Sequence, residues 1–358
     1  MKLTRWAFFI SFISSTAFAD DINIVGTLDY VLKSPSTSLR RAVASPMKQI
    51  KLLKLELSDT MQKAMSEHID SAIESNEQFF NSPNLPNKVQ LGMNNVPVLD
   101  QGRHGSCATF AVTAAVDAAL NKGDYISQLC LLQLGNFLEP NSYIKSGWNG
   151  SFNSMILNEI NIFGVINKST QKEKGCGSLT EYPLLANQSP KQEMTPIDYH
   201  QLSESIKKTV DWTSVMTTYS VDEDKSLLAV KATLNAKDRL SFGVILVDLN
   251  LGVVGAVGQH NTANDTWIFT PEIKKDTIDF LNGYNPNFQL GGHAMVITGF
   301  DDDAIAVDDK GRQHKGLLTL RNSWGSTAGD NGNFYMSYEY FDTLSTEAER
   351  IRKVKSKA

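Results

Sequence analysis

Cys107 lies in a stretch whose residue types could make a nucleophile. It follows Gly105-Ser106 and opens an alanine-rich run, so a glycine-containing loop would deliver the cysteine to the first turn of a helix. A thiol in that place is stabilised as a thiolate by the positive end of the helix dipole and by unpaired backbone N–H groups. Six residues upstream, the amide of Gln101 could join those N–H groups in holding the oxyanion that forms when a thiolate adds to a carbonyl.

A cysteine nucleophile needs a base, and His293 is the best placed of the histidines. It follows a pair of glycines and precedes the apolar run 294–300, which predicts a buried strand ending in a turn at residues 301–303. A histidine at the mouth of a rigid strand can be aimed at a partner on another element. His104 lies only three residues before Cys107, but its loop position predicts solvent exposure or a packing role.

Asn322 is a candidate for the group that orients this histidine. It follows a second predicted strand, residues 317–321, and begins Asn-Ser-Trp-Gly. Its amide oxygen could accept a hydrogen bond from His293 Nδ1–H, and the indole of Trp324 could shield that bond from water. Nucleophile, base and orienting group then appear in the chain order Cys, His, Asn.

These motifs together resemble those of papain-like cysteine peptidases, in a divergent form of bacterial type. The match is to Gln-Gly-x-x-Gly-Ser-Cys for 101–107, to Gly-His-Ala for 292–294 and to Asn-Ser-Trp-Gly for 322–325. The resemblance covers roughly residues 89–340. It implies an α+β fold of two lobes, one helical and one β-barrel-like, with a substrate cleft between them. It also implies roles for four residues: Cys107 as nucleophile, His293 as acid/base, Asn322 as orienting residue and Gln101 as oxyanion donor.

A weaker similarity extends to the substrate-binding part of the family. Residues 147–151 resemble its Gly-Cys-Asn-Gly-Gly segment, which makes Gly150 and Ser151 candidate cleft residues beside Trp324. Ser151 replaces a glycine whose backbone pairs with substrate in the family, and Ala108 replaces the tryptophan that usually follows the nucleophile. These departures bear on substrate specificity more than on the class of reaction.

The N-terminus predicts export. Residues 1–19 combine basic residues, a short apolar core and a final Ala-Phe-Ala, which is the pattern of a cleavable signal peptide. No later stretch has the roughly 18 apolar residues of a membrane span. We therefore expect a secreted protein, periplasmic or extracellular, in an oxidising compartment.

Three cysteines in an oxidising compartment suggest one disulfide and one free thiol. With Cys107 as nucleophile, Cys130 and Cys176 are left to pair, and closing that loop would contribute roughly 3–4 kcal/mol to stability. The alternative is that both are reduced and buried.

Residues 20–88 precede the catalytic motifs and predict a separate segment. A strand is expected over 49–57, then a helix capped by Ser58-Asp59 with apolar residues at helical spacing, and then a breaker-rich linker over 81–88. An amphipathic helix needs a surface to cover. By resemblance this is a pro-segment that inhibits or chaperones residues 89–358 and is removed near the linker; the alternative is a permanent N-terminal subdomain.

Within residues 89–358, helices are predicted over 107–120, 154–163 and 226–234, and a buried strand over 243–248. The long separation of Cys107 from His293 indicates an insertion around 250–290, interpreted as a hairpin or lid beside the cleft.

Composition and spacing exclude several other functions. A formal net charge of −5 without single-sign blocks disfavours nucleic acid and anionic lipid as partners. Cysteines and histidines never cluster at metal-ligand spacing, so no metal or other cofactor is expected. The main interpretation is a secreted peptidase acting on proteins or peptides through an acyl-enzyme. Two alternatives stay open: a papain-like binding protein without catalysis, and an amidase or acyl transferase acting on non-protein peptides such as those of cell walls.

Overall fold

The computed structural model describes most of the chain outside the N-terminal leader and several loops. The described residues are 21–32, 48–71, 79–80, 84–141, 143–186, 189–217, 226–247, 265–285, 289–308 and 310–354. The predicted signal peptide, residues 1–19, lies outside them. None of the described helices combines the length and apolar composition that a membrane-spanning helix needs.

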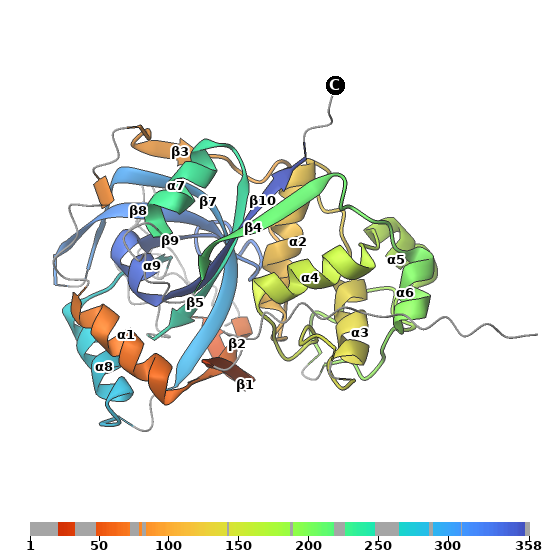
Figure 1. Ribbon diagram of the computed structural model, residues 1–358, viewed down its shortest axis with the longest axis horizontal. Helices are drawn as coiled ribbons and strands as arrows, with labels where there is room; N and C mark the ends of the chain where they lie inside the picture. The colour runs from red at the N-terminus through yellow and green to blue at the C-terminus, as the bar shows by residue number, and fades with distance from the viewer. Residues whose placement is uncertain are drawn as a thin grey trace, which may run out of the picture.

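The chain forms two lobes, which confirms the predicted α+β fold (Figure 1). One lobe is helical and is drawn in yellow to green. Its helices are α2 (Cys107–Leu120), α3 (Gln128–Leu138), α4 (Asn153–Phe163), α5 (Lys168–Lys174) and α6 (Pro196–Leu202). The other lobe is built on a large sheet, and the helices α7 (Ser226–Asn235), α8 (Pro271–Leu281) and α9 (Tyr338–Leu344) pack around it.

The sheet of the β lobe runs in the order β4-β10-β5-β7-β8-β9-β6. Its strands are β4 (Val210–Thr217), β5 (Arg239–Leu246), β6 (Thr266–Trp267), β7 (Leu290–Val307), β8 (Gln313–Arg321), β9 (Asn333–Ser337) and β10 (Ser345–Lys353), with β3 (Lys88–Gln90) paired to β7. The predicted strands at 294–300 and 317–321 fall within β7 and β8, and the strand predicted at 243–248 overlaps β5, which begins earlier and ends at Leu246.

Helix α2 packs the helical lobe against the sheet. Thirteen of its residues are buried, and it contacts β7, β5 and β10 as well as α4. Alanine is frequent in α2, and its small side chain lets the neighbouring strands and helix pack close to the helix backbone. The predicted start at Cys107 is confirmed. The helix is capped at its C-terminal end by Asn121, which takes the left-handed conformation (φ 57°).

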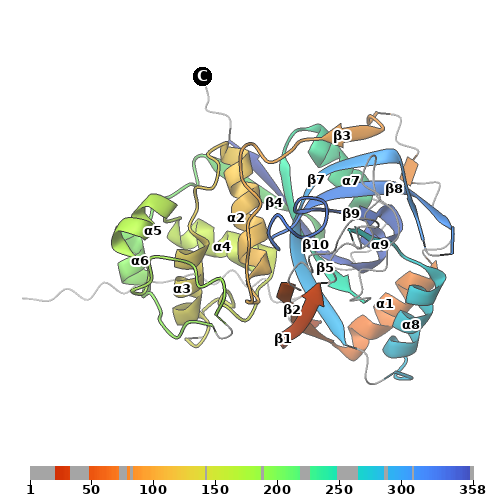
Figure 2. The same cartoon turned by 180° about the vertical axis from the view of Figure 1, so that it is seen from behind.

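The N-terminal segment adds a hairpin and a helix to the β lobe. The predicted strand is β2 (Lys48–Leu57), and the predicted helix is α1 (Asp59–Ser71), whose start is capped by Ser58 Oγ accepting from Met61 N–H at 3.1 Å. The sequence analysis did not predict β1 (Ile22–Leu32), which pairs antiparallel with β2. In both views the hairpin lies at the lower edge of the junction between the lobes, below α2 and beside β7 (Figures 1 and 2).

Strand β7 and the predicted insertion differ from the expectations for the β lobe. The turn predicted at 301–303 is wrong, because β7 continues to Val307 and meets β8 again after a register shift between Asp301 and Ile305. Of the predicted insertion, residues 265–285 form β6 and α8, and β6 joins the sheet beside β9. Residues 248–264, where a hairpin or lid was expected, lie outside the described residues.

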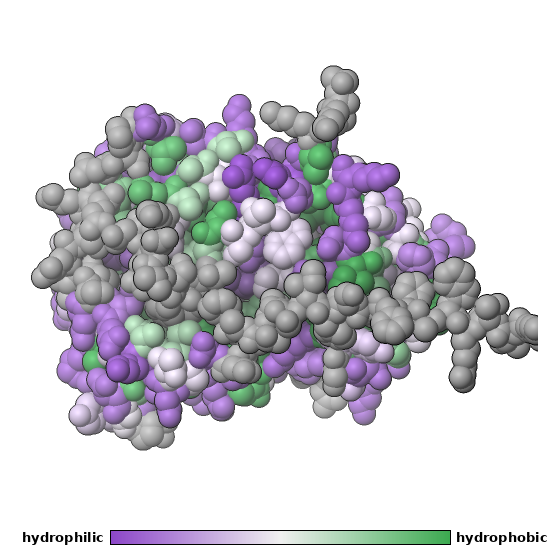
Figure 3. Space-filling view, viewed as in Figure 1, coloured by the Kyte–Doolittle hydropathy of each residue, from purple (hydrophilic) through white to green (hydrophobic). Residues whose placement is uncertain are grey.

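On the face seen in Figure 3, hydrophilic side chains dominate over α1 and α8, and apolar side chains appear as small patches between them. Large apolar side chains that are strongly exposed, such as Leu185, Ile197 and Tyr284, come from separate parts of the chain.

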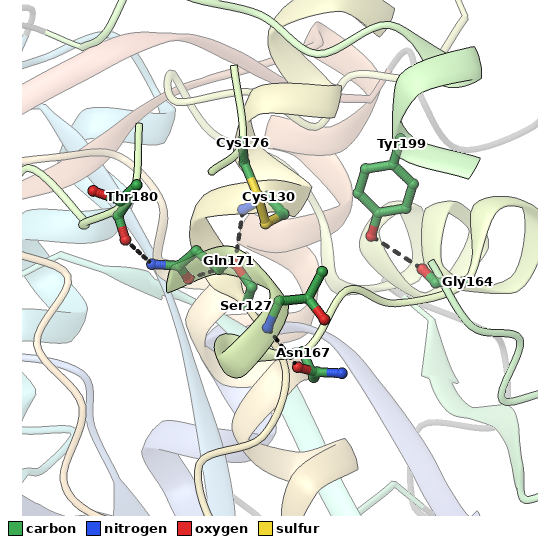
Figure 4. Close-up of a disulfide and its surroundings, with 9 residues drawn as sticks. Ser127, Cys130, Gly164, Asn167, Gln171, Cys176, Thr180 and Tyr199 are labelled. Atoms are coloured by element: carbon green, nitrogen blue, oxygen red, sulfur yellow. Dashed lines mark hydrogen bonds between the residues drawn. A yellow bond between two sulfur atoms is a disulfide. The ribbon is translucent and has the colours of Figure 1, made fainter. Parts of the chain in front are cut away.

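The disulfide predicted between Cys130 and Cys176 is confirmed; it closes a separation of 46 residues inside the helical lobe. Polar contacts hold its surroundings: Ser127 Oγ accepts from Cys130 N–H and donates to Gln171, which donates in turn to the Thr180 carbonyl (Figure 4). The disulfide thus joins α3 to the loop after α5.

We expect replacement of both cysteines by serine to lower the free energy of unfolding by about 3–4 kcal/mol, because the unfolded chain regains the entropy of a long loop. Chemical denaturation of the oxidised parent and of the double variant measures the difference. The folded, non-reduced parent should show one alkylatable thiol, that of Cys107. A count of two or three would contradict the bridge.

Candidate active site

His293 and Asn322 form a direct, buried hydrogen bond. The Nε2 atom of His293 lies 2.8 Å from Asn322 Oδ1, and both side chains are 2% exposed. Asn322 Oδ1 also accepts from the backbone N–H of Ser323 at 2.7 Å. Because the oxygen accepts from a fixed backbone group, its position is set, and it selects the tautomer of the imidazole that carries hydrogen on Nε2.

The ring nitrogen in this bond differs from the expected one. The sequence analysis assigned the hydrogen bond to Nδ1, whereas Nε2 makes it. The side chain of His293 extends from β7 toward the start of the loop after β8, so the nitrogen farther from its own backbone reaches the amide. Nδ1, which is buried and has no hydrogen-bond partner among the described residues, keeps a lone pair that can accept a proton.

Trp324 covers this pair on one side. Its indole stacks on the imidazole of His293 with ring centroids 4.5 Å apart and planes at 24°. Trp324 is 1% exposed and also contacts Trp267 and Phe334. Its place is therefore behind the histidine, where it excludes water from the hydrogen bond, as the sequence suggested. In this arrangement it presents no surface to solvent for a substrate.

Cys107 opens α2 on the opposite side of the lobe junction. Its side chain is fully buried, and its sulfur interacts with the backbone N–H groups of Ala108 and Ala294. Since Ala294 directly follows His293, the two lobes bring the sulfur to the residue next to the imidazole. The two predicted reactive residues, 186 positions apart in sequence, thus lie on two elements, α2 and β7, that contact each other at the lobe junction.

Gln101 holds the loop before Cys107 in place. Its Nε2 donates to the His104 carbonyl at 2.9 Å, and its Oε1 accepts from Ser323 Oγ at 2.7 Å. Its backbone N–H also donates to the Ser323 carbonyl at 2.8 Å. These contacts tie the nucleophile loop to the residue after Asn322. One N–H of the amide is left for the predicted oxyanion role.

His104 is a packing residue, and the expected alternative of solvent exposure is wrong. It is 1% exposed, donates through Nε2–H to the Pro183 carbonyl at 2.9 Å, and packs edge-on against Trp148 at 4.8 Å between centroids. Burial lowers the pKa of His104. Trp148 lies in the same core and donates to Gln133, so these two residues fill the space where the papain-like resemblance would place disulfide cysteines.

The N-terminal hairpin lies over the site, a contact that short-range sequence patterns do not predict. Residues Leu53 to Leu55 of β2 pair antiparallel with Gly292 to Leu290 of β7, immediately before His293. A Cβ on Gly105 would come within 2.8 Å of Thr27 Cγ2, and one on Gly150 within 2.6 Å of Leu53 Cδ2. Strands β1 and β2 therefore press on the nucleophile loop and on the candidate cleft residue Gly150.

Polar contacts fix the hairpin on both lobes. Lys145 Nζ donates to the Ile24 carbonyl at 2.6 Å, and Lys48 forms an ion pair with Asp100 in the nucleophile loop. Ser151, the other candidate cleft residue, is 4% exposed and donates to the Lys145 carbonyl at 2.6 Å. With the hairpin in place, every candidate site residue is buried.

Burial keeps the reactive pair neutral in this covered arrangement. It raises the pKa of the Cys107 thiol to about 12, against the opposing effect of the backbone N–H groups of Ala294 and Ala108. It lowers the pKa of His293 to about 4, although the bond to Asn322 favours the charged ring. The helix terminus was expected to stabilise a thiolate, but here the loss of solvent outweighs it.

We therefore expect acid to weaken the packing of β2 over the site. Above pH 6.5 His293 is neutral whether covered or solvated, so the pH has no effect there. Between 6.5 and about 4 a solvated ring binds a proton and the covered ring does not, so the covered form loses stability as the pH falls. Hydrogen exchange of the Leu53 to Leu55 amides, corrected for intrinsic rates, should show more opening at pH 4.5 than at pH 7, by up to roughly 100-fold. Equal protection at both pH values would contradict this.

Within the described ranges, histidine, cysteine and carboxylate side chains nowhere gather in a group that could hold a metal ion.

Comparisons with known proteins agree with the motifs. Residues 284–353 match the model of the Peptidase C1-like family, a segment that contains His293 and Asn322. No curated protein sequence matches the chain.

Similar solved structures include xylellain, a cysteine protease from Xylella fastidiosa, at 21% identity over 78% of this chain and 90% of that one, with a TM-score of 0.47. Procathepsin L 3 of the Tenebrio molitor larval midgut is similar at 17% identity over 76% and 71%, with a TM-score of 0.45. The proform of the ragweed pollen allergen Amb a 11, also a cysteine protease, is similar at 17% identity over 78% and 70%, with a TM-score of 0.45. The predicted resemblance to papain-like cysteine peptidases is confirmed by the family match of residues 284–353, the segment that carries His293 and Asn322.

Proposed function

We propose that this chain is a secreted cysteine peptidase that hydrolyses peptide bonds through Cys107, His293 and Asn322. The observation that carries the proposal is the buried bond from His293 Nε2–H to Asn322 Oδ1, which leaves Nδ1 as a free base at the junction where the sulfur of Cys107 lies. A cysteine, a histidine and an orienting amide are the parts that thiol-based acyl transfer needs.

In the proposed reaction, Nδ1 of His293 takes the proton of the Cys107 thiol and the thiolate adds to a peptide carbonyl carbon. The N–H groups at the start of α2 and the remaining amide N–H of Gln101 stabilise the oxyanion. The imidazolium then protonates the leaving amine, and a thioester remains on Cys107. A water molecule, activated by the same imidazole, hydrolyses the thioester and restores the thiol.

The N-terminal segment is proposed as the inhibitor of this site. Its hairpin occupies the strand edge of β7 beside His293, where an extended peptide would otherwise pair. Support also comes from the anchor that follows α1. Lys231 Nζ, which is 1% exposed, donates to the Phe79 carbonyl at 2.6 Å and pairs with Asp302 at 2.7 Å, while the rings of Phe79 and Phe80 pack on Tyr338.

The predicted linker, residues 81–88, follows this anchor directly. A cut there would separate the segment from the rest of the chain without breaking the contacts of Phe79 and Phe80. The proposed order of events is export, cleavage in the linker, and release of the hairpin from the junction. Support for export is the leader pattern of residues 1–19 together with the Cys130–Cys176 disulfide, a bond typical of oxidising compartments.

The test is stoichiometric titration of the processed protein with an epoxide that alkylates papain-like thiols, followed by cleavage profiling on a mixed peptide library. The proposal expects one equivalent of reagent to label Cys107 and to abolish all cleavage. Labelling without any peptide cleavage would favour a binding protein, and cleavage restricted to non-protein amides would favour an amidase or acyl transferase.

A further inference from the structure

Glu347 is a buried carboxylate that the proposed reaction does not use. It lies on β10 in the β lobe and is 8% exposed. Its Oε1 accepts from the backbone N–H of Asn153 at 2.6 Å and its Oε2 from that of Ser154 at 3.3 Å. These two N–H groups open α4, which belongs to the helical lobe. A single side chain therefore connects the two lobes through charge-assisted hydrogen bonds.

Helix α4 has no cap of its own. The residue before it, Phe152, makes no side-chain hydrogen bond to the helix, and its first turn contains no acidic residue. The first N–H groups of a helix have no partner within the helix, and a carboxylate is the group that best satisfies them and the helix dipole. Glu347 supplies from another lobe what the local sequence of α4 lacks.

The strand register places Glu347 in line with Ala294, whose backbone N–H interacts with the sulfur of Cys107. Glu347 pairs with Gly243 of β5, and Gly243 pairs with Ala294 of β7, so the three residues share one face of the sheet. A Cβ on Gly243 would come within 3.2 Å of Glu347 Cγ and 3.3 Å of its Oε1. The side chain of Glu347 thus packs over Gly243, on the sheet face that both residues share with Ala294.

We propose that Glu347 is a positioning residue of the site: by capping α4 from β10, it fixes the helical lobe that carries Cys107 against the sheet that carries His293. This inference rests on the proposed function, in which the spacing of those two residues decides reactivity. It also gives the carboxylate an electrostatic influence on the nucleophile, because the charge of Glu347 opposes formation of the Cys107 thiolate.

Three substitutions in the full chain separate these effects. Glu347→Ala removes the cap and the charge. Glu347→Gln removes the charge but keeps an oxygen that can accept from Asn153 N–H. Glu349→Gln is the matched control, since Glu349 is 1% exposed on the same strand, two residues further on, and its carboxylate interacts with Ser214 of β4.

Two measurements test the proposal. Hydrogen exchange of the first-turn amides of α4 should accelerate at least about tenfold in Glu347→Ala, much less in Glu347→Gln and not in the control. Alkylation of Cys107 by iodoacetamide between pH 7 and 10 should be severalfold faster in Glu347→Gln than in the parent, because the charge of Glu347 opposes the Cys107 thiolate and its loss lowers the thiol pKa. A purely structural cap would not produce this second change.

Unchanged exchange in Glu347→Ala would overturn the proposal, and so would an alkylation rate in Glu347→Gln equal to that of the control. Neither readout depends on peptide cleavage. If the parent protein cleaves no peptide, the proposed function fails, while the exchange and alkylation results still decide whether Glu347 positions the lobes.

Discussion

Replacing Cys107 by alanine is expected to reduce peptide hydrolysis by the processed protein on the order of 10⁵-fold or to background. The nucleophile is lost, no other free cysteine exists in the chain, and the remaining groups can only bind and polarise the substrate. Steady-state kinetics on a peptide found by library profiling measures the loss, and epoxide labelling should disappear with it.

Asn322→Ala is the variant to compare with Cys107→Ala, and its loss of activity should be much smaller. Loss of one hydrogen bond to a charged imidazole costs about 1.5–3 kcal/mol, which corresponds to roughly a 10- to 100-fold lower kcat. Both variants should unfold at a temperature close to that of the parent, so that lost activity is not lost folding. Hydrolysis retained by Cys107→Ala would remove the assignment of the nucleophile.

Leu53→Asp in the uncleaved chain is expected to activate the site without proteolysis. Leu53 is 5% exposed, pairs with Gly292 and presses on Gly150, so a carboxylate there would be buried against apolar and backbone atoms. Losing the buried leucine weakens the covered form by about 2–5 kcal/mol. A free-energy change of about 3 kcal/mol should raise the rate of Cys107 labelling by the epoxide on the order of 100-fold.

The matched control for Leu53→Asp is Gln49→Asp, which places the same charge on an exposed position of the same strand. It should leave the labelling rate at the level of the parent. If Leu53→Asp stays as unreactive as the parent, while cleavage of the linker activates both, the hairpin is not the element that blocks the site. If the uncleaved parent already reacts at the rate of the processed protein, the N-terminal segment is no inhibitor.

Local patterns predicted the elements that local physics controls. The helix at 107–120 has alanine at six of its fourteen positions and the helix at 154–163 is followed by a glycine, and their bounds in α2 and α4 differ from the expectation by at most one residue. Strand β1 was not predicted, because its pairing with β2 and its burial under the helical lobe depend on residues far from it in sequence. The turn at 301–303 failed for the same reason: an aspartate run favours a turn, but pairing with β8 carries the strand beyond it.

The candidate residues of the site came from motifs, but their relations came from the fold. Sequence order alone could not tell which nitrogen of His293 meets Asn322, since that depends on the distance from β7 to the loop after β8. It also could not single out Glu347, because the carboxylate acts on α4 across nearly two hundred residues. The role of Gly243, which lies between Glu347 and Ala294 in the sheet, likewise depends on the strand register.

By itself, the sequence determined which groups are present for chemistry: a cysteine at a helix start, a histidine at a strand start, an asparagine after a strand, and two further cysteines that can bridge. The tertiary structure alone decided that the hairpin of residues 22–57 lies over these groups, that they are neutral there, and that the two lobes are joined through Glu347. The physical reason is that residue type and short-range spacing fix intrinsic reactivity and helix or strand preference, whereas burial, pKa and alignment depend on which distant segments pack together.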